Sequence, residues 1–208
     1  MAIVFAANSS WVIKKAADKF APDYKISYDD ITGNVFTGVN IAGLKFDNKE
    51  ISKNIKFSWN PSKILYKRVA INEISGEDLD VETVKALIAS FPKSVDDENS
   101  SSSPLPVVIN VDKIHLTVKP FEEQGILIEK TVLNVEDVSY SSDDISVDSL
   151  SLNVDTNITD LVLLASLNDG KLIINELRVE NIDSEVLEKM FLPQEDNASV
   201  QKEEAEEE

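Results

Sequence analysis

The sequence predicts a mainly β protein, in which an N-terminal helix is followed by an open, curved antiparallel β-sheet groove with short helices. Two observations lead to this fold class. Most of the 208 residues fall in short runs rich in Ile, Val, Leu, Tyr and Phe with polar residues between them, which is typical of strands. Several of these runs also share one interruption of their alternation, which indicates strands that bend at the same place.

The first element expected is a helix that ends before Pro22. Polar residues at 8–10 can cap it, and Trp11, Ala16 and Phe20 then fall on one face at helical spacing. The leading run Met1 to Ala7 is the tail of a membrane anchor in one interpretation and an ordinary frayed N-terminus in the other. By itself it is far shorter than the roughly 20 apolar residues that cross a bilayer.

Turn signals separate the strands expected after this helix. The strongest are Thr32-Gly33-Asn34, Asp47-Asn48-Lys49 and Asn168-Asp169-Gly170. A further turn is expected at 61–66, and short helices are expected near 81–90 and 184–191.

The apolar residues of the strands alternate, skip two positions and alternate again. The pattern occurs in Val39-x-Ile41-x-x-Leu44-x-Phe46, Val69-x-Ile71-x-x-Ile74, Ile109-x-Val111-x-x-Ile114-x-Leu116-x-Val118, Leu133-x-Val135-x-x-Val138-x-Tyr140, Ile145-x-Val147-x-x-Leu150-x-Leu152-x-Val154 and Leu172-x-Ile174-x-x-Leu177-x-Val179. A strand has a side-chain period of two, so the skip reverses the faces unless a β-bulge or bend absorbs the extra residue. Strands that all bend there would stack into a trough with an apolar inside.

The predicted lining of this trough consists of apolar residues from the repeated pattern. They are Ile41, Leu44, Phe46, Ile55, Phe57, Ile71, Ile74, Val111, Ile114, Leu116, Val118, Val135, Val138, Val147, Leu150, Leu152, Ile174 and Leu177. The alternative is that the skipped pairs are tight turns and that these residues form the sealed core of an ordinary β-sandwich. The pattern alone favours neither.

Composition divides the chain into five segments. Residues 1–22 form the helix, 23–92 a first β module with a short terminal helix, and 107–193 a second module of the same kind. The serine-rich, proline-punctuated residues 93–106 have no helical or strand period and are expected to be a disordered linker. Residues 194–208 are expected to be an acidic disordered tail or linker.

The two modules end alike. Val69-Ala70-Ile71-Asn72-Glu73-Ile74 resembles Leu172-Ile173-Ile174-Asn175-Glu176-Leu177, and each run is followed by a short helix and an acidic segment. Self-similarity at a constant offset is typical of repeat architectures. Since the first such ending introduces more strands, we expect the second to do so as well, and the chain to be a piece of a longer one.

Charge and composition exclude several function classes. The net charge is −18, which argues against nucleic acid because its binding depends on clusters of Lys and Arg. Residues 1–70 are nevertheless basic, with 11 Lys or Arg against 6 Asp or Glu. The absence of cysteine and the single histidine exclude thiolate sites and most histidine-based catalysis. We therefore expect no enzyme and no cofactor, although a hydrolase that uses unrecognised carboxylates is a remaining alternative.

Two remaining candidates for metal binding are weak. His115 lies in an alternating strand with no second histidine, so we expect a partly exposed strand residue and not a metal ligand. Asp143-Asp144 and the pair Asp155 and Asp160 lack the glycine-spaced loop typical of calcium sites. The sequence predicts no metal site.

Residues 11–79 carry a family resemblance in the order and spacing of several features. These are Ala16-Ala17-x-x-Phe20-x-Pro22, Ile26, Ile31-Thr32-Gly33, Gly38-Val39-x-Ile41-x-x-Leu44-x-Phe46, Ile55-x-Phe57-x-Trp59-x-Pro61, Leu65 and Val69-x-Ile71. The stretch resembles the membrane-proximal beginning of the TamB family, the inner-membrane subunit of the translocation and assembly module. The linker and the strands that restart at Val107 resemble the family more loosely.

The resemblance implies a function as well as a fold. TamB belongs to the AsmA-like bridge proteins, in which an inner-membrane anchor precedes a long β groove that crosses the periplasm of Gram-negative bacteria. It implies transport of phospholipid toward the outer membrane and, with an outer-membrane barrel partner, assembly of outer-membrane proteins. The sequence departs from the family in lacking a complete signal anchor and the family's length. The alternative is a β-rich envelope scaffold or adhesin-like module that binds proteins without lipid transfer.

Overall fold

The computed structural model describes residues 10–91, 108–123, 125–141 and 144–184. Its helices are α2 (Ser10–Phe20), η1 (Ala21–Tyr24), η2 (Pro61–Tyr66) and α3 (Val81–Ser90). Its strands are β1 (Ile26–Ser27), β2 (Asp30–Asn34), β3 (Gly38–Phe46), β4 (Lys49–Asn60), β5 (Arg68–Leu79), β6 (Val108–Val118), β7 (Phe121–Glu123), β8 (Ile126–Tyr140), β9 (Ile145–Thr156), β10 (Asp160–Asn168) and β11 (Lys171–Glu180).

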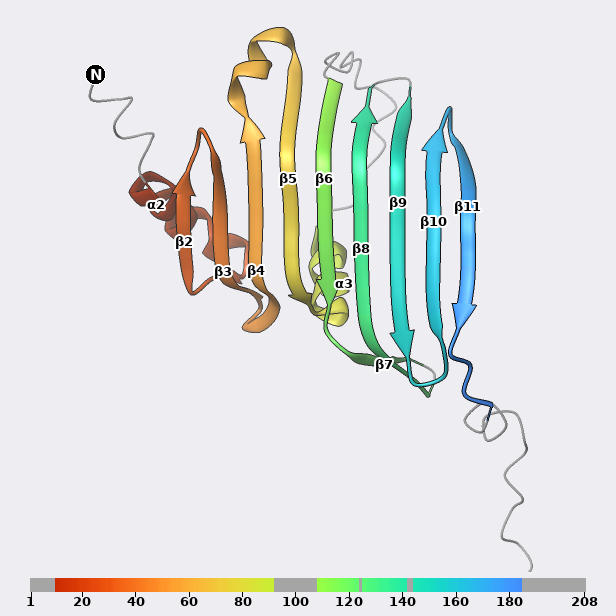
Figure 1. Cartoon of the computed structure of the whole chain (residues 1–208). Coiled ribbons are helices and arrows are strands. Elements are labelled where there is room, and N and C mark those ends of the chain that lie inside the picture. Colours follow the sequence, from red (N-terminus) through yellow and green to blue (C-terminus); the bar gives the residue numbers. More distant parts are fainter. Residues whose placement is uncertain (1–9, 92–107, 124, 142–143, 185–208) are drawn as a thin grey trace, which may run out of the picture.

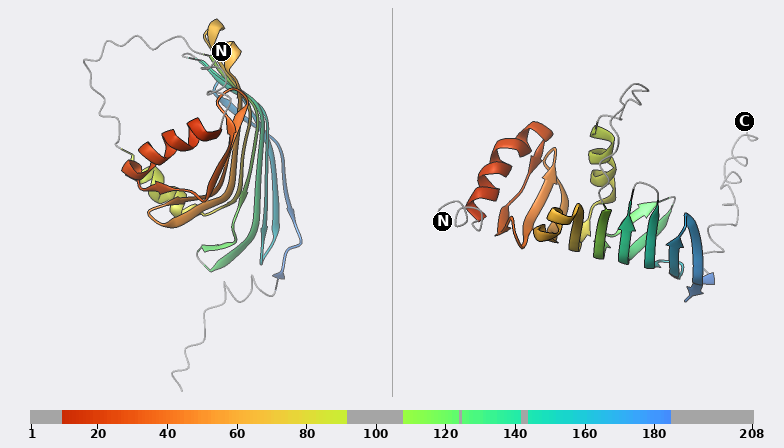
Figure 2. Two further views of the ribbon diagram at one scale, coloured as in Figure 1. Left: turned by 90° about the vertical axis from the view of Figure 1, so that its left-hand side faces the viewer. Right: turned by 90° about the horizontal axis from the view of Figure 1, so that it is seen from above.

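All the strands belong to one open, curved sheet (Figure 1). The order is β1-β3-β4-β5-β6-β8-β9-β10-β11, with β2 paired to β3 and β7 paired to β8 at the margins. The sheet curves about the middle of its strands, and α2 and α3 both lie on its concave side (Figure 2). The expected mainly β fold with an open, curved sheet is therefore confirmed.

One junction departs from the antiparallel expectation. β5 and β6 run parallel, with Val69 opposite Ile109 and Ile71 opposite Val111, whereas every other described pair of strands is antiparallel. Parallel neighbours need a crossover, and α3 is the described element on the connection between β5 and β6. The two predicted β modules thus pair edge to edge in one sheet.

The helices begin and end at recognisable residues. α2 is followed directly by η1, which begins at Ala21 and contains Pro22, and Lys25 ends η1 with φ of 57°. The Asp80 side chain caps α3 by accepting the Thr83 N–H at 2.8 Å. No helix among the described residues is long and apolar enough to cross a membrane. Three predicted segments, namely residues 1–9, the linker and the C-terminal tail, lie outside the described residues, as does all but the start of the helix expected at 184–191.

Two of the three strong turn signals form hairpin turns. Asp47 and Asn48 connect β3 to β4 with φ of 49° and 65°, and Asp169 and Gly170 connect β10 to β11 with φ of 49° and 68°. Positive φ at both central residues is what a two-residue hairpin turn requires. The prediction for 32–34 was wrong, because these residues belong to β2.

The turn expected at 32–34 lies three residues further along. Asn34 makes it, since its side-chain oxygen accepts the N–H groups of Phe36 and Thr37 at 2.9 and 3.0 Å. Gly33 has φ of 100° but keeps its pairing with Val39 in β3. Glycine therefore marks a distortion of the strand here and not its end.

Register shifts keep the apolar residues on one face despite the two-residue skip. In β4, Phe57 and Trp59 alternate without a skip, so they share a face. They pair with Ile74 and Ile71 of β5, and a register shift at this point absorbs the extra residue of β5. Ile71 and Ile74 consequently lie on the same face although they are three positions apart.

A second register shift has the same effect between β9 and β10, toward the other edge of the sheet. In β10, Ala165 and Leu167 alternate without a skip and pair with Leu150 and Val147 of β9 across a second register shift. β5, β6, β8 and β9 carry their skips in register with one another. Asp137, within the skip of β8, has φ of 53°. The bulged-strand interpretation of the sequence therefore describes this sheet.

Candidate functional site

The candidate site is the concave apolar face, which we define as four rows of residues paired across the sheet. The first row is Trp59, Ile71, Val111, Val138, Val147, Leu167 and Leu172; the second is Val39, Phe57, Ile74, Ile114, Val135, Leu150, Ala165 and Ile174; the third is Ile41, Ile55, Gly76, Leu116, Leu133, Leu152, Leu163 and Leu177; and the fourth is Leu79, Val118, Thr131, Val154, Leu161 and Val179. Eight strands about 4.8 Å apart make the middle rows about 34 Å long.

The predicted lining residues fall within these rows, except for Leu44 and Phe46. Leu44 pairs with Ser52, and Phe46 pairs with Lys49 and Ile26 near the edge of the sheet. Gly43 has φ of 59°, and the pairing of β3 with β4 shifts register between Leu44 and Lys45. Leu44 and Phe46 therefore lie beyond the part of β3 that continues the rows.

Sequence reasoning missed the whole contribution of β10. This strand supplies Leu161, Leu163, Ala165 and Leu167, which alternate strictly. They do not belong to the repeated pattern, because β10 has no skip. Plain alternation from Leu161 to Leu167 is the signal that could have found them.

Exposure varies across the concave apolar face. Val111 and Val135, near its middle, are each 8% exposed, and Ala165 is 2% exposed. Along β11, by contrast, Leu172 is 62% and Leu177 is 66% exposed. Central residues have paired neighbours on both adjacent strands, whereas those on the edge strand β11 have a neighbour on one side only.

No second sheet covers this face in the described part of the chain, because all of its strands belong to a single sheet. α3 begins beside β4, where the Asp80 N–H donates to the carbonyl of Ile51 at 2.8 Å, and it lies over β5 and β6 on the concave side (Figures 1 and 2). The concave apolar face over β8 to β11 has no helix on it among these residues (Figure 2). The sealed sandwich that the sequence also allowed is not the arrangement found.

The opposite, convex face is polar. On this face Lys56 pairs with Glu73 between β4 and β5. His115 is also on this side, half-buried, with its Nδ1 2.6 Å from the Asn134 side-chain oxygen. It is a partly exposed strand residue, as expected.

The carboxylates singled out as calcium candidates do not gather into a site. Asp155 and Asp160 are opposite each other on β9 and β10, and the Asn181 side-chain amide donates to the Asp160 carboxylate. Asp143 lies outside the described residues. Within the described ranges no group of three or more acidic or histidine side chains could hold a metal ion.

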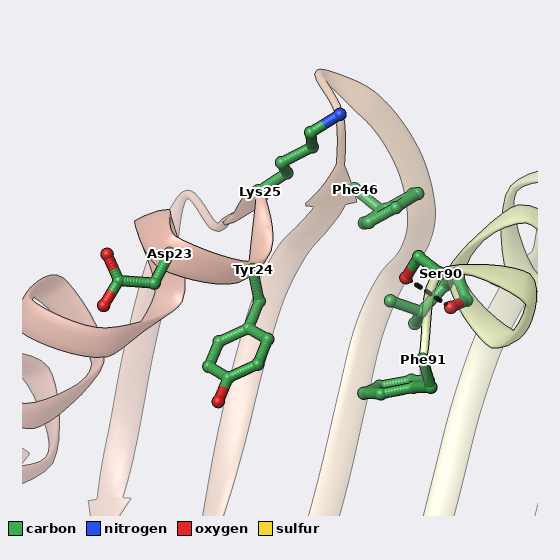
Figure 3. Close-up of a pocket in the computed structure, with 7 residues that line it drawn as sticks. Asp23, Tyr24, Lys25, Phe46, Ser90 and Phe91 are labelled. Carbon is green, nitrogen blue, oxygen red and sulfur yellow. Dashed lines mark hydrogen bonds between the residues drawn. The ribbon is translucent and has the colours of Figure 1, made fainter. Parts of the chain in front are cut away.

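One small cavity adjoins the first strands. It has a volume of about 230 Å³ and lies between η1, the end of β3 and the last turn of α3 (Figure 3). Tyr24, Phe46, Leu87 and Phe91 give it a largely apolar wall. Phe46, one of the predicted lining residues, thus contributes to this cavity and not to the rows.

The repeat seen in the sequence is also present in the backbone. The Asp80 N–H donates to the carbonyl of Ile51 at 2.8 Å, and the Asp183 N–H donates to the carbonyl of Ile158 at 2.7 Å. In each copy the residue two positions before the aspartate has φ of 53°. β5 and β11 are thus equivalent strands, and β5 is the one whose outer side is covered by β6.

No family model and no curated protein matches the chain.

Proposed function

We propose that this chain is a periplasmic segment of a bridge protein that shields phospholipid acyl chains on its concave apolar face during transport between the inner and outer membranes. The proposal agrees with the TamB resemblance of the sequence. It includes a role in outer-membrane protein assembly with a barrel partner, and attachment to the inner membrane through an N-terminal anchor.

The observation that carries the proposal is the contrast between the two faces of the sheet. The concave face is a largely aliphatic surface about 34 Å long, whereas the convex face carries an ion pair and hydrogen-bonded polar side chains. A soluble monomer rarely leaves so extended an apolar surface without a ligand or partner. Its length and aliphatic chemistry suit an acyl chain.

The physical role of such a face is to keep methylenes out of water. Each methylene exposed on transfer through water costs about 0.8 kcal/mol. A lipid whose acyl chains stay on the concave face avoids most of that cost, while its head group remains hydrated at the open side of the sheet. The described residues offer no group of acidic or histidine side chains for a metal, and the proposed step needs no bond to be made or broken.

Site-specific photo-crosslinking tests the proposal. A photoreactive amino acid is placed at Ile114 or Leu150 on the concave face, and in matched controls at the next residue, His115 or Ser151, which points to the convex face. The full chain is expressed in the periplasm of a Gram-negative bacterium and irradiated. We expect phospholipid adducts from positions 114 and 150 and none from 115 and 151.

The contradicting result is equally clear. Absence of adducts at Ile114 and Leu150, or equal labelling of both faces, would overturn the acyl-chain role. Native mass spectrometry of the purified chain provides an independent readout, since bound phospholipid adds a discrete mass.

A protein-binding scaffold without lipid transfer is the second candidate. It is favoured by the edge strand β11, whose Leu172, Ile174 and Leu177 are 62%, 58% and 66% exposed. Exposed edge strands readily pair with strands of other chains. Capture of a protein by a photoreactive residue at Ile174, together with a lipid-free mass, would favour this candidate.

A further inference from the structure

The connection between β4 and β5 carries a protruding apolar tip. η2 projects beyond the upper end of the two strands in Figure 1. At this tip Ile64 is 49%, Leu65 is 86% and Tyr66 is 75% exposed. Three large apolar side chains in succession are thus left in water, which marks an interaction site more often than an ordinary surface.

The tip is held in one conformation by local hydrogen bonds. The Asn60 side-chain oxygen accepts the Ser62 N–H at 3.2 Å and the Ser62 hydroxyl at 2.6 Å. At the other end, Lys67 adopts φ of 55°, and its N–H donates to the carbonyl of Ile64 at 2.9 Å. Because the turn is ordered in advance, binding through Leu65 requires little further ordering of the backbone.

The charge around the tip is opposite to that of the chain. Lys63, Lys67 and Arg68 flank the apolar residues, and no acidic residue occurs between Asn60 and Asn72. The net charge of the whole chain is −18. Within the part of the chain that the structure describes, none of the three cations forms an ion pair. They are therefore available to an anionic surface.

We propose that η2 docks this protein on an anionic phospholipid surface, with Leu65 and Tyr66 entering the interface and the three cations contacting lipid phosphates. A convex tip needs a partner that deforms around it, which a bilayer does and a folded acidic protein does only with a matching pocket. Tyrosine is suited to the boundary because its ring is apolar and its hydroxyl polar. Basic side chains beside it add electrostatic attraction to anionic lipid.

Vesicle co-sedimentation of the full chain tests the proposal. The vesicles are phosphatidylcholine alone, or phosphatidylcholine with phosphatidylglycerol. We expect binding only to the vesicles that contain phosphatidylglycerol, weakening as salt is added because exposed charges are screened. Leu65→Ser should weaken binding about tenfold or more by removing buried methylenes. The double variant Lys63→Glu, Lys67→Glu should weaken it at least as much.

Ile88→Ser is the matched control, since Ile88 is 66% exposed on α3, away from the tip. It should leave vesicle binding unchanged. The proposal is overturned if the unaltered chain does not bind phosphatidylglycerol vesicles, if Leu65→Ser binds as well as the unaltered chain, or if Ile88→Ser loses as much binding as Leu65→Ser. Crosslinking at Ile114 and Leu150 does not involve η2, so failure of this proposal and failure of the acyl-chain role are distinguishable.

Discussion

Two leucines in one row of the concave apolar face test whether that face is open. Leu152 in β9 has Leu133 and Leu163 beside it on the neighbouring strands, and it is half-buried. Leu177 in β11 pairs with Leu163 on one side only and is 66% exposed. Replacing each by alanine removes the same atoms from the same row, so any difference between the two losses of stability reflects position in the sheet alone.

The expected magnitudes follow from burial. Leu→Ala removes about three methylene equivalents, which are worth about 2.4 kcal/mol when fully buried. Leu177→Ala, with roughly a third of that surface buried, should lower the free energy of unfolding by about 0.8 kcal/mol. Leu152→Ala should lower it by about 2 kcal/mol, because a site open to solvent leaves no sealed cavity.

Urea denaturation followed by circular dichroism measures both variants, with the shift in midpoint as the readout. A sealed core predicts a different result, since leucine deletions that leave an enclosed cavity cost about 3 to 5 kcal/mol. A loss above about 3 kcal/mol for Leu152→Ala, or equal losses for the two variants, would refute the open-face reasoning.

Three further predictions concern local structure. Asp80→Ala should lower the free energy of unfolding by about 1 kcal/mol, because Asp80 caps α3 through the Thr83 N–H. That hydrogen bond lowers the pKa of Asp80. The stability that the cap contributes is therefore fully present above the ordinary pKa of an aspartate, and it is lost as the pH falls through the lowered pKa of Asp80. Gly43→Ala should cost about 1 to 2 kcal/mol, since φ is 59° and the new Cβ would meet the Asp29 carboxylate. Ultraviolet titration should show that Tyr28 has a pKa of about 12, raised chiefly by burial, and Tyr28→Phe should lack this late phase. The stability that neutral Tyr28 contributes is present below about pH 10 and is lost as the pH rises toward 12.

Each of these has a contradicting outcome. The cap prediction fails if Asp80→Ala and the unaltered chain share a urea midpoint at neutral pH, or if their difference persists unchanged at the lowest pH at which both fold. The glycine prediction fails if Gly43→Ala is as stable as the unaltered chain. The tyrosine prediction fails if Tyr28→Phe retains the late phase.

Short-range pattern was enough to predict much of the sheet. The hairpin turns at Asp47-Asn48 and Asp169-Gly170 need positive φ, which Asn, Asp and Gly tolerate best, so their sequence determines them locally. The two-residue skip allowed either bulged strands or tight turns, and the register shifts between paired strands decided for bulged strands. Among the turn signals, only the turn predicted at 32–34 was placed wrongly, because the Asn34 side chain accepts the N–H groups of the residues after it and the turn forms there.

The sequence by itself determined a mainly β chain with a one-sided aliphatic pattern, since alternation and turn chemistry depend on neighbours along the chain. Tertiary structure decided the rest: that β6 lies parallel to β5, that the strictly alternating β10 completes the rows, and that Leu44 and Phe46 fall outside them. It also decided that Leu65 and Tyr66 protrude into solvent while equally apolar residues such as Val135 are buried. Pairing partners and exposure depend on contacts between residues far apart in the chain, which no local pattern encodes.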